Sequence, residues 1–402
     1  MSEKKELTKI RKEIDELDKQ LLTLLNSRLV LAQQAGKAKK DEIIYRPERE
    51  ASIYRNLKIN NTGPLEDQHI MNIYKEIIST CRAKEENLEI AFLGPEGTYS
   101  DSALNSTFGS SIKKNSTETI EEVFKEVEGK KSHYGIVPIE NSTEGSINIT
   151  LDCLASHEIN ICGEIEMTIH HSLMGLNEAL PRNDFEIHAH EQTLAQCKNW
   201  LDSYCPDVKR VAVLSNAQAA QTASNKSKIL AIAGSLAAEQ YGLNIIQNNI
   251  EDYPENTTRF ITIGLQEVEA TGKDKTSLIV TTKNESGALY NVLKPIKKNN
   301  LNLTHITYRP SKVNKWSYSF FLDFEGHRQD ENVSVLLKEL NDIGAELKIR
   351  VRFKVRVDVI SHVKQYYGGA HLSLEINLTQ FHLPLGNPCN HVCKLGFVLA
   401  IF

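Results

Sequence analysis

The sequence lacks the features that mark several specialised classes of protein. No apolar run approaches the length of a membrane span, and the first residues, MSEKKEL, lack the apolar segment of a signal peptide. Neither sign of charge dominates, because 47 basic and 52 acidic residues give a net charge of -5. With 40% apolar residues the chain is also unlike a disordered one. We therefore expect a folded, cytoplasmic protein that binds neither nucleic acid nor membranes.

Cysteine is scarce and irregularly spaced. The seven cysteines are an odd number, which in a reducing compartment indicates free thiols. Cys389 and Cys393, with His391 between them, are the nearest approach to a metal-binding pair. A second pair at ligand spacing is missing, so we expect no metal site.

The first part of the chain predicts helices. A length of 402 residues indicates two to four domains. Residues 5–86 predict one long helix and two shorter ones that begin near Pro47 and Leu65. Apolar residues of the long helix are spaced by three and four, at Leu7, Ile10, Ile14, Leu17, Leu21, Leu24 and Leu31. Three helices of this size cannot bury that stripe alone, so we expect dimerisation to cover it.

One arginine interrupts the stripe. Arg28 lies between Leu24 and Leu31, where a leucine is expected, and an unpaired guanidinium inside a bundle is costly. Either an internal carboxylate or an anionic ligand can neutralise it. Lys39 lies about 16 Å further along the same helix face, so both side chains can converge on a compact dianion. Arg11 lies about 25 Å from Arg28, so it reaches such a ligand only from a second subunit.

The helical segment resembles the helical chorismate mutases. The resemblance rests on R-x2-I-D-x-L-D-x2-L-x2-L-L-x2-R from Arg11 to Arg28, G-K-A-K at 36–39 and R-P-E-R-E at 46–50. It implies an intertwined dimer of three-helix chains that rearranges chorismate to prephenate without covalent catalysis or a cofactor. It also implies that Arg11, Arg28 and Lys39 bind the two carboxylates and the ether oxygen, and that Glu50 meets the ring hydroxyl. Such a site holds a reactive conformer and stabilises charge on the ether oxygen.

Three positions of the substrate site depart from the best-known form of that family. Arg46 stands where an aspartate can occur, Cys81 replaces a serine and Glu85 replaces a glutamine. An ionised carboxylate has no proton to donate to the ether oxygen. If Glu85 takes the catalytic place of the glutamine, we therefore expect the mutase to need acid.

From Leu88 the pattern changes to short apolar runs that alternate with helix-like stretches. This predicts an open α/β fold of two lobes with much parallel sheet. The segment at 250–260 places Thr257, Thr258 and Arg259 between a turn and a short strand from Phe260 to Gly264. We expect this arrangement to hold the polar side chains at a sheet edge, aimed at a ligand. The alternative is a hairpin entry with a solvated arginine.

The second segment resembles prephenate dehydratase over about residues 90–265. The resemblance implies that water and carbon dioxide leave prephenate to give phenylpyruvate. It makes Thr258 the essential threonine, which we interpret as a hydrogen-bond donor or proton relay, with Asn141 and Gln192 as polar partners. We expect Arg259 to anchor the pyruvyl carboxylate, because a cation on the departing carboxylate would stabilise the ground state. The motifs are G-P-E-G-T-Y-S at 94–100, G-I-V-P-I-E-N-S-T-E-G-S at 135–146, H-x-Q-T at 190–193, A-G-S-x-A-A at 233–238 and N-T-T-R-F at 256–260.

The order strand, helix, strand, strand, helix, strand after the polar link at 266–275 predicts a ferredoxin-like βαββαβ unit. G-A-L-Y at 287–290, N-L-T-H-I at 302–306 and R-P-S at 309–311 resemble the phenylalanine-binding ACT domain. The resemblance implies an effector site at Gly287, Ala288, Leu289 and Arg309. Thr307 and Tyr308 depart from its usual pattern. Alternation from Leu347 to Val357 still predicts a last strand.

Together these patterns predict a multidomain α and α/β chain that is a homodimer or higher homo-oligomer. The expected divisions are a mutase domain at 1–87, a dehydratase domain at 88–267, an ACT domain at 276–351 and a tail of unknown role at 352–402. We expect a bifunctional chorismate mutase and prephenate dehydratase, inhibited by phenylalanine, whose sites are joined only by the linker at 83–88. The alternatives are a dehydratase with a structural helical arm and a non-enzymatic amino-acid sensor.

Overall fold

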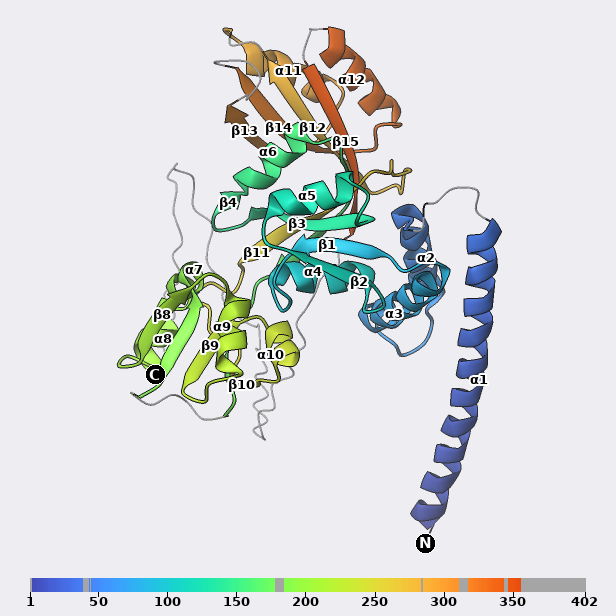
Figure 1. Ribbon diagram of the computed structural model, residues 1–402. Helices are drawn as coiled ribbons and strands as arrows, with labels where there is room; N and C mark the ends of the chain where they lie inside the picture. The colour runs from blue at the N-terminus through green and yellow to red at the C-terminus, as the bar shows by residue number, and fades with distance from the viewer. Residues whose placement is uncertain are drawn as a thin grey trace, which may run out of the picture. The chain divides into compact units, whose positions relative to one another are not determined.

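The computed structural model describes residues 2–38, 43, 45–177, 184–282, 285–310, 317–342 and 346–355. Its N-terminal segment contains three helices, α1 (Ser2–Ala38), α2 (Pro47–Asn60) and α3 (Asp67–Glu85), as predicted (Figure 1). Proline at the first position of α2 suits a helix start, because its ring presets φ and no intrahelical N–H bond is lost there. Lys39 lies outside the described residues. Among the helices that the structure describes, none has the length and apolar composition of a membrane span.

The middle of the chain forms two lobes, each on its own mixed sheet. In the first lobe, β1 (Glu89–Leu93) pairs in parallel with β2 (Lys113–Thr117) and β3 (Tyr134–Asn141). β11 (Thr257–Gly264) then lies antiparallel between β3 and β5 (Asn160–Thr168). The remaining elements of this lobe are α4 (Tyr99–Phe108), α5 (Ile120–Glu128), β4 (Gly145–Ser146) and α6 (Asn148–Ser156).

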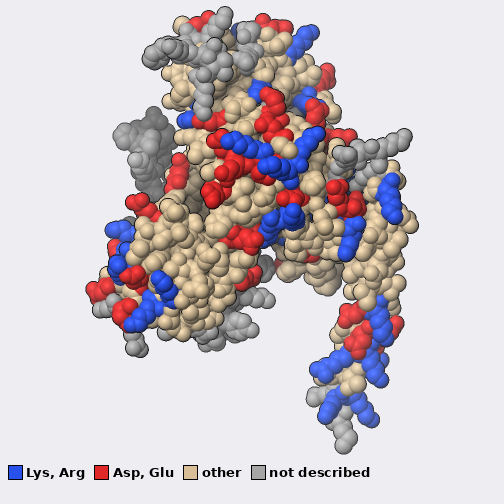
Figure 2. Space-filling view, in the orientation of Figure 1, with Lys and Arg blue, Asp and Glu red and all other residues tan. Residues whose placement is uncertain are grey.

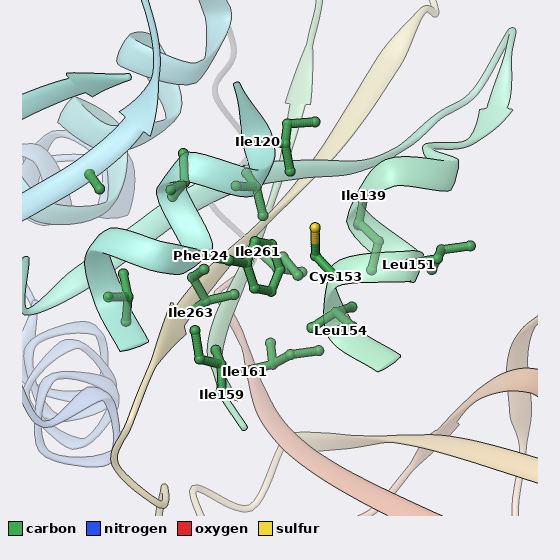
Figure 3. Close-up of a cluster of buried hydrophobic side chains, with 14 of the residues drawn as sticks. Ile120, Phe124, Ile139, Leu151, Cys153, Leu154, Ile159, Ile161, Ile261 and Ile263 are labelled. Carbon is green, nitrogen blue, oxygen red and sulfur yellow. The ribbon is translucent and has the colours of Figure 1, made fainter. Parts of the chain in front are cut away.

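Figure 3 shows the core of the first lobe, where α5 and α6 cover one face of the sheet. Helix α5 presents Ile120 and Phe124 to this core, and a capping box between Thr119 and Glu122 fixes where the helix begins. β11 contributes Ile261 and Ile263. The strand that carries the predicted catalytic residue therefore lies within the core of the lobe.

The second lobe has the strand order β10-β6-β9-β7-β8. Two chain segments, 169–171 and 248–256, connect it to the first lobe. Glu251 ties them together, since its carboxylate contacts the His170 ring at 2.7 Å and accepts from the His171 backbone N–H at 2.9 Å. The elements are β6 (Ser172–Gly175), β7 (Glu186–His190), α7 (Glu191–Gln196), α8 (Lys198–Tyr204), β8 (Lys209–Val213), α9 (Asn216–Ala223), β9 (Ile229–Ala233), α10 (Ser235–Tyr241) and β10 (Asn244–Gln247).

The C-terminal unit has the predicted ferredoxin-like topology. Its antiparallel sheet has the strand order β13-β14-β12-β15. Strand β15 continues beyond residue 351, and Lys354 and Val355 pair in parallel with Glu164 and Ile165 of β5. The sheets of this unit and of the first lobe are therefore continuous. The elements are β12 (Asp274–Thr282), α11 (Ala288–Lys298), β13 (Leu303–Pro310), β14 (Tyr318–Glu325), α12 (Glu331–Asp342) and β15 (Glu346–Val355).

The predicted placement of the 257–260 segment at a sheet edge is wrong. β11 begins at Thr257 rather than at Phe260, and it is an interior strand with β3 and β5 on its two sides. Because both edges of β11 are paired, Thr258 is only 8% exposed. A ligand therefore meets Thr258 as a nearly buried hydroxyl.

Candidate functional sites

A pocket of about 330 Å³ lies between the three N-terminal helices. Four arginines and two glutamates line it, so cationic side chains outnumber anionic ones. That balance suits a ligand with two carboxylates. The lining residues are Arg28, Leu31 and Ala32 from α1, Arg46, Arg49, Glu50 and Ile53 from α2 and the residue before it, and Ile78, Cys81, Arg82 and Glu85 from α3.

The arginine that interrupts the apolar stripe of α1 faces this pocket. Arg28 Nη1 donates to Cys81 Sγ at 2.9 Å. Cys81 is only 6% exposed, so its contact with Arg28 orients the guanidinium. The structure thus brings together five predicted residues, Arg28, Arg46, Glu50, Cys81 and Glu85, whereas Arg11 does not line the pocket of its own chain.

Gly36 has a steric reason to be glycine. A Cβ at this position would lie 3.0 Å from Glu85 Oε2 and 3.1 Å from Glu85 Cγ. The glycine of the G-K-A-K motif therefore leaves room for the Glu85 side chain against α1. This contact places the Glu85 carboxyl between α1 and α3, at the wall of the pocket.

Arg82 is a site residue that the sequence analysis missed. Its Nη1 donates to Glu50 Oε1 at 2.6 Å and its Nη2 donates to the carbonyl of Phe108 at 2.8 Å. Burial raises the pKa of Glu50, while the charge of Arg82 opposes that rise. Arg82 follows the buried Ile78 by four positions on α3, so an arginine on an apolar helix face was again the available signal.

The N-terminal helical segment also packs on the first lobe, so the prediction that only a linker joins the two sites is wrong. Tyr45 is 2% exposed, and its ring centroid lies 4.9 Å from that of Phe108 and 5.3 Å from that of Tyr134. Its carbonyl accepts from Gln266 Nε2 at 2.9 Å. Part of the helical pocket is therefore supported by the first lobe.

Thr258 and Asn141 face each other across β11 and β3, where they are register partners. Asn141 Nδ2 donates to Thr258 Oγ1 at 2.8 Å and to Asn256 Oδ1 at 2.9 Å. The amide orientation is fixed because Asn141 Oδ1 accepts from the backbone N–H of Thr143 at 3.0 Å. Since the Thr258 oxygen is the acceptor in this pair, its hydroxyl proton can be donated to a ligand.

Gln192 belongs to the other lobe, near the start of α7. Its backbone N–H donates to His190 Nδ1 at 3.4 Å, and its side chain is half-buried. Within the described part of the chain, no hydrogen bond joins Gln192 to Thr258. A ligand that contacts both residues must therefore lie between the lobes.

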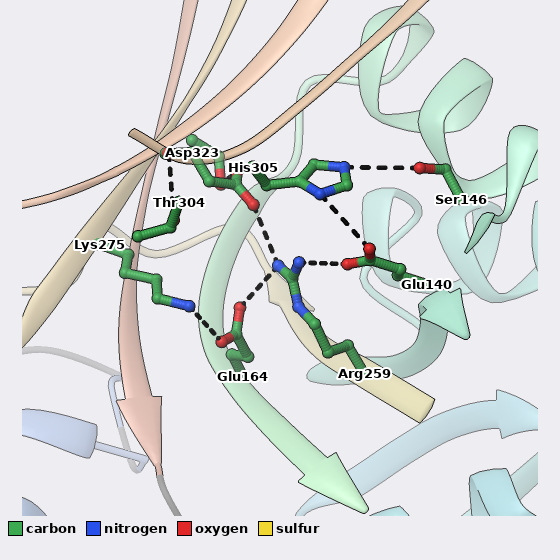
Figure 4. A network of polar contacts seen from close by, with 9 residues as sticks. Glu140, Ser146, Glu164, Arg259, Lys275, Thr304, His305 and Asp323 are labelled. Carbon is green, nitrogen blue, oxygen red and sulfur yellow. Dashed lines mark hydrogen bonds and ion pairs between the residues drawn. The ribbon is translucent and has the colours of Figure 1, made fainter. Parts of the chain in front are cut away.

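Arg259 does not join Thr258, because successive strand side chains point to opposite faces of a sheet. Its guanidinium contacts Glu140 and donates to Glu164 Oε2 and Asp323 Oδ2, both at 3.0 Å (Figure 4). Three carboxylates already surround the charge. This placement does not agree with the prediction that Arg259 anchors the pyruvyl carboxylate.

The glycine-rich segment at 94–100 packs against the second lobe. Gly97 has a φ of +83°, and a Cβ there would lie 3.2 Å from Ala237 Cα. A Cβ at Gly234 would lie 2.9 Å from the ring of Tyr99. The G-P-E-G-T-Y-S and A-G-S-x-A-A motifs therefore hold the two lobes against each other.

The predicted effector residues lie in the βαββαβ unit. Gly287 precedes α11 with a φ of +82°, and Ala288 and Leu289 are half-buried at the helix start. Arg309 on β13 donates through Nε and Nη2 to the two carboxylate oxygens of Asp152, each at 3.0 Å. That hydrogen bonding raises the pKa of Arg309. Arg309 therefore connects this unit to α6 of the first lobe.

Comparison with known proteins agrees with this division of the chain. Residues 10–86 match the family model for chorismate mutase type II, and residues 90–268 match that for prephenate dehydratase. A bifunctional chorismate mutase/prephenate dehydratase from Stutzerimonas stutzeri is 43% identical over 356 residues, which cover 87% of this chain and 98% of the relative.

Solved structures resemble this chain over about two thirds of its length, and the following two each cover 66% of it. A prephenate dehydratase from Arthrobacter aurescens in complex with L-Phe is 30% identical, with a TM-score of 0.61 and 89% of its own chain covered. A protein described as a novel type of quorum quenching acylase is 25% identical, with a TM-score of 0.60 and 98% of its own chain covered.

The fold and the two sites define an enzyme that joins an isomerase to a carbon–oxygen lyase in one chain. The chain belongs to the family of bifunctional chorismate mutase/prephenate dehydratases. It rearranges chorismate to prephenate and converts prephenate to phenylpyruvate.

Proposed function

We propose that the two reactions take place at the two sites described above, on separate sets of residues. The mutase domain then comprises residues 1–87 and the dehydratase domain residues 88–267, followed by a regulatory unit at 276–351 whose last strand continues to Val355. The tail at 352–402 otherwise has no assigned role.

In the helical pocket, Arg28 binds one carboxylate of chorismate and Lys39 meets the ether oxygen. Glu50, held by Arg82, meets the ring hydroxyl. The rearrangement is pericyclic, so the pocket has to hold a compact conformer and stabilise the negative charge that develops on the ether oxygen. Glu85 can stabilise the charge on the ether oxygen only while its carboxyl carries a proton.

The remaining contact, Arg11, comes from a second copy of the chain. The predicted stripe on α1 is uncovered, with Leu17 59% and Leu24 66% exposed. In Figure 2, charged residues gather at the N-terminal end of α1, next to a stretch that has none. A row of leucines with helical spacing pairs well with another helix. We propose a homodimer in which each α1 covers the other and supplies Arg11 to the partner pocket.

In the dehydratase site, Thr258 donates its hydroxyl proton to the departing ring hydroxyl, which leaves as water, and a proton from solvent restores the threonine hydroxyl. The bond to the ring carboxylate breaks at the same time, and its electron pair completes the aromatic ring as carbon dioxide is released. Asn141 holds the threonine oxygen, and Gln192 approaches from the second lobe. The hydrogen bond from Asn141 to Thr258 is the observation that carries this assignment.

Separate assays of the full chain with chorismate and with prephenate test the proposal. Turnover of prephenate alone would leave a dehydratase with a structural helical arm. Turnover of neither would leave an amino-acid sensor. Turnover of both at wild-type rates after replacement of Thr258 would place the dehydratase site elsewhere.

We also propose that phenylalanine binds the βαββαβ unit, as an ACT domain does, and inhibits the dehydratase. The ferredoxin-like topology supports this, as does the N-terminus of α11 behind Gly287, where an amino-acid carboxylate is favoured. The A. aurescens relative in complex with L-Phe supports it further. The dehydratase rate as a function of phenylalanine concentration is the test, and an unchanged rate would make the unit structural.

A further inference from the structure

A cluster of buried charges joins the first lobe to the βαββαβ unit (Figure 4). Arg259 of β11 donates to Glu164 and Asp323, and Lys275 Nζ donates to the second oxygen of Glu164 at 3.0 Å. The side chains of Glu164 and Asp323 are 0% and 8% exposed, and those of Lys275 and Arg259 are 11% and 15% exposed. We call Glu140, Glu164, Arg259, Lys275 and Asp323 the Arg259 cluster.

Each cation of the cluster is paired with a carboxylate. Burial by itself lowers the pKa of Arg259, but the carboxylates of Glu164, Asp323 and Glu140 outweigh it and raise the pKa, so the guanidinium stays charged. Asp323 is fixed in turn, since its other oxygen accepts from Ser277 Oγ at 2.7 Å. Removing Asp323 takes one hydrogen-bond partner from the Arg259 guanidinium and one from Ser277, so the guanidinium is no longer held in this orientation.

Two residues of the cluster are chain neighbours of the catalytic pair. Arg259 follows Thr258 on β11, Glu140 precedes Asn141 on β3, and Arg259 and Glu140 are themselves register partners. The same two strands are therefore held together by Asn141–Thr258 on one face and by Arg259–Glu140 on the other. The register between β3 and β11 shifts directly after Arg259, so the ladder between these two strands is irregular at this point.

Three strands of the βαββαβ unit, β12, β13 and β14, carry residues that belong to the cluster or contact it. Lys275 lies on β12 and Asp323 on β14. His305 on β13 is the register partner of Asp323, and its Nδ1 lies 3.4 Å from Glu140 Oε1. A displacement of this sheet relative to β11 must therefore change the partners of Arg259.

We propose that Arg259 is a positioning residue through which the βαββαβ unit sets the geometry of Thr258 and Asn141, and thereby the dehydratase turnover number. The inference rests on the proposed role of Thr258. Arg259 acts through the strand pair and does not touch the substrate. A structural change in the regulatory unit then alters the position of the Thr258 hydroxyl through the Arg259 side chain and the peptide unit between Thr258 and Arg259.

The test replaces Asp323, which belongs to the regulatory unit and lies on the face of the sheet opposite Thr258. We expect Asp323→Ala to lower the dehydratase kcat roughly three- to thirtyfold, in the range of measured coupling effects, with little change in KM. Asp323→Asn keeps a hydrogen-bonding side chain but loses the charge, so its kcat should fall between those of wild type and Asp323→Ala. Inhibition by phenylalanine should weaken in the same order.

Glu158→Gln is the matched control. Glu158 pairs with Lys348 of β15 at 2.7 Å, so this ion pair also connects the two units but does not involve β3 or β11. The dehydratase kcat of Glu158→Gln should equal that of wild type. The mutase rate should be unchanged in this variant and in both Asp323 variants.

An unchanged kcat in Asp323→Ala, or an equal fall in Glu158→Gln, would overturn the coupling. So would a parallel loss of mutase activity, because it would indicate general destabilisation; Asp323→Asn covers the case in which the alanine variant does not fold. Thr258→Ala distinguishes a failure of the coupling from a failure of the proposed catalytic site. If that variant is inactive while Asp323→Ala is normal, only the coupling is wrong; if it stays active, the proposed catalytic site is wrong.

Discussion

At the scale of single residues, the proposed role of the Thr258 hydroxyl depends on Asn141. The amide donates to the threonine oxygen, so the hydroxyl proton is available for donation to a ligand. A well-placed proton donor contributes about 10²- to 10⁴-fold to a rate. We therefore expect Thr258→Ala to lose about that much dehydratase kcat while the mutase rate stays at the wild-type value.

Thr258→Ser is the control for that prediction, because it keeps a hydroxyl on the same strand. It should retain most of the activity. Initial rates of phenylpyruvate formation, measured beside chorismate consumption in the same preparations, give both values. Equal losses in the serine and alanine variants would show that the methyl group and strand packing matter, not the hydroxyl.

Glu85 leads to a second prediction, on the hydrogen bond to the ether oxygen. An ionised carboxylate has no proton to donate, whereas the amide of Glu85→Gln always has one. We therefore expect the mutase rate of Glu85→Gln to exceed that of wild type at neutral pH, measured as initial chorismate consumption. Glu86→Gln, next in the chain and not lining the pocket, should behave as wild type. A mutase rate in Glu85→Gln at or below the wild-type value would contradict the idea.

At the scale of elements, the exposed leucine stripe makes α1 the element most in need of a partner. Leu21 is 54% exposed in the middle of that stripe. We expect Leu21→Glu to weaken the proposed dimer and to lower the mutase kcat/KM, because Arg11 then no longer reaches the partner pocket. Dehydratase activity should persist, because Thr258 and Asn141 belong to one chain.

Gln20→Glu adds the same charge to the neighbouring position and should leave the mass in solution unchanged. Light scattering after size exclusion, run beside both activity assays, checks the prediction. Wild-type mutase activity in Leu21→Glu would mean that no second α1 contributes to the pocket.

Helices and strands differ in how far the sequence predicted them. The three helices could be predicted because their apolar pattern involves residues only three or four positions apart. The same pattern showed that Arg28 stands where an apolar residue is expected. The position of β11 depends on β3 and β5, which come from distant parts of the chain, so it was wrongly placed at a sheet edge. The opposite faces of Thr258 and Arg259 were nevertheless predictable, because strand alternation separates them once the strand begins at Thr257.

At the scale of the whole molecule, the mutase and dehydratase parts share a boundary that the sequence did not reveal. The contact between Arg82 and Phe108 leaves no signal in the sequence, because Phe108 accepts through its backbone carbonyl and every residue type has one. Tyr45 likewise reads as part of a loop, yet it is buried between two aromatic rings of the first lobe. Contacts between domains depend on surfaces that form only after each part has folded.

A prediction about the isolated helical domain follows from that boundary. A fragment ending at residue 87 exposes Tyr45, at a cost of about 2 kcal/mol or more, and leaves Arg82 without the Phe108 carbonyl. We expect this fragment to have a lower mutase kcat/KM than the full chain and a lower unfolding midpoint in circular dichroism. Full-length Thr258→Ala is the control, because it lacks dehydratase chemistry but keeps the support. Equal mutase rates in the fragment and the full chain would contradict the expectation.

The pairing of β15 with both β12 and β5 has a consequence for synthesis of the chain. Until residues 346–355 leave the ribosome, β12 and β5 each have one edge without its final partner. Unpaired strand edges recruit other chains. For β5, nearly two hundred further residues must be synthesised before its partner strand is complete. Strand β15 therefore covers the edge of β12 and a short part of the edge of β5. We therefore expect a chain truncated before residue 346 to aggregate, even though it contains every residue of both proposed catalytic sites.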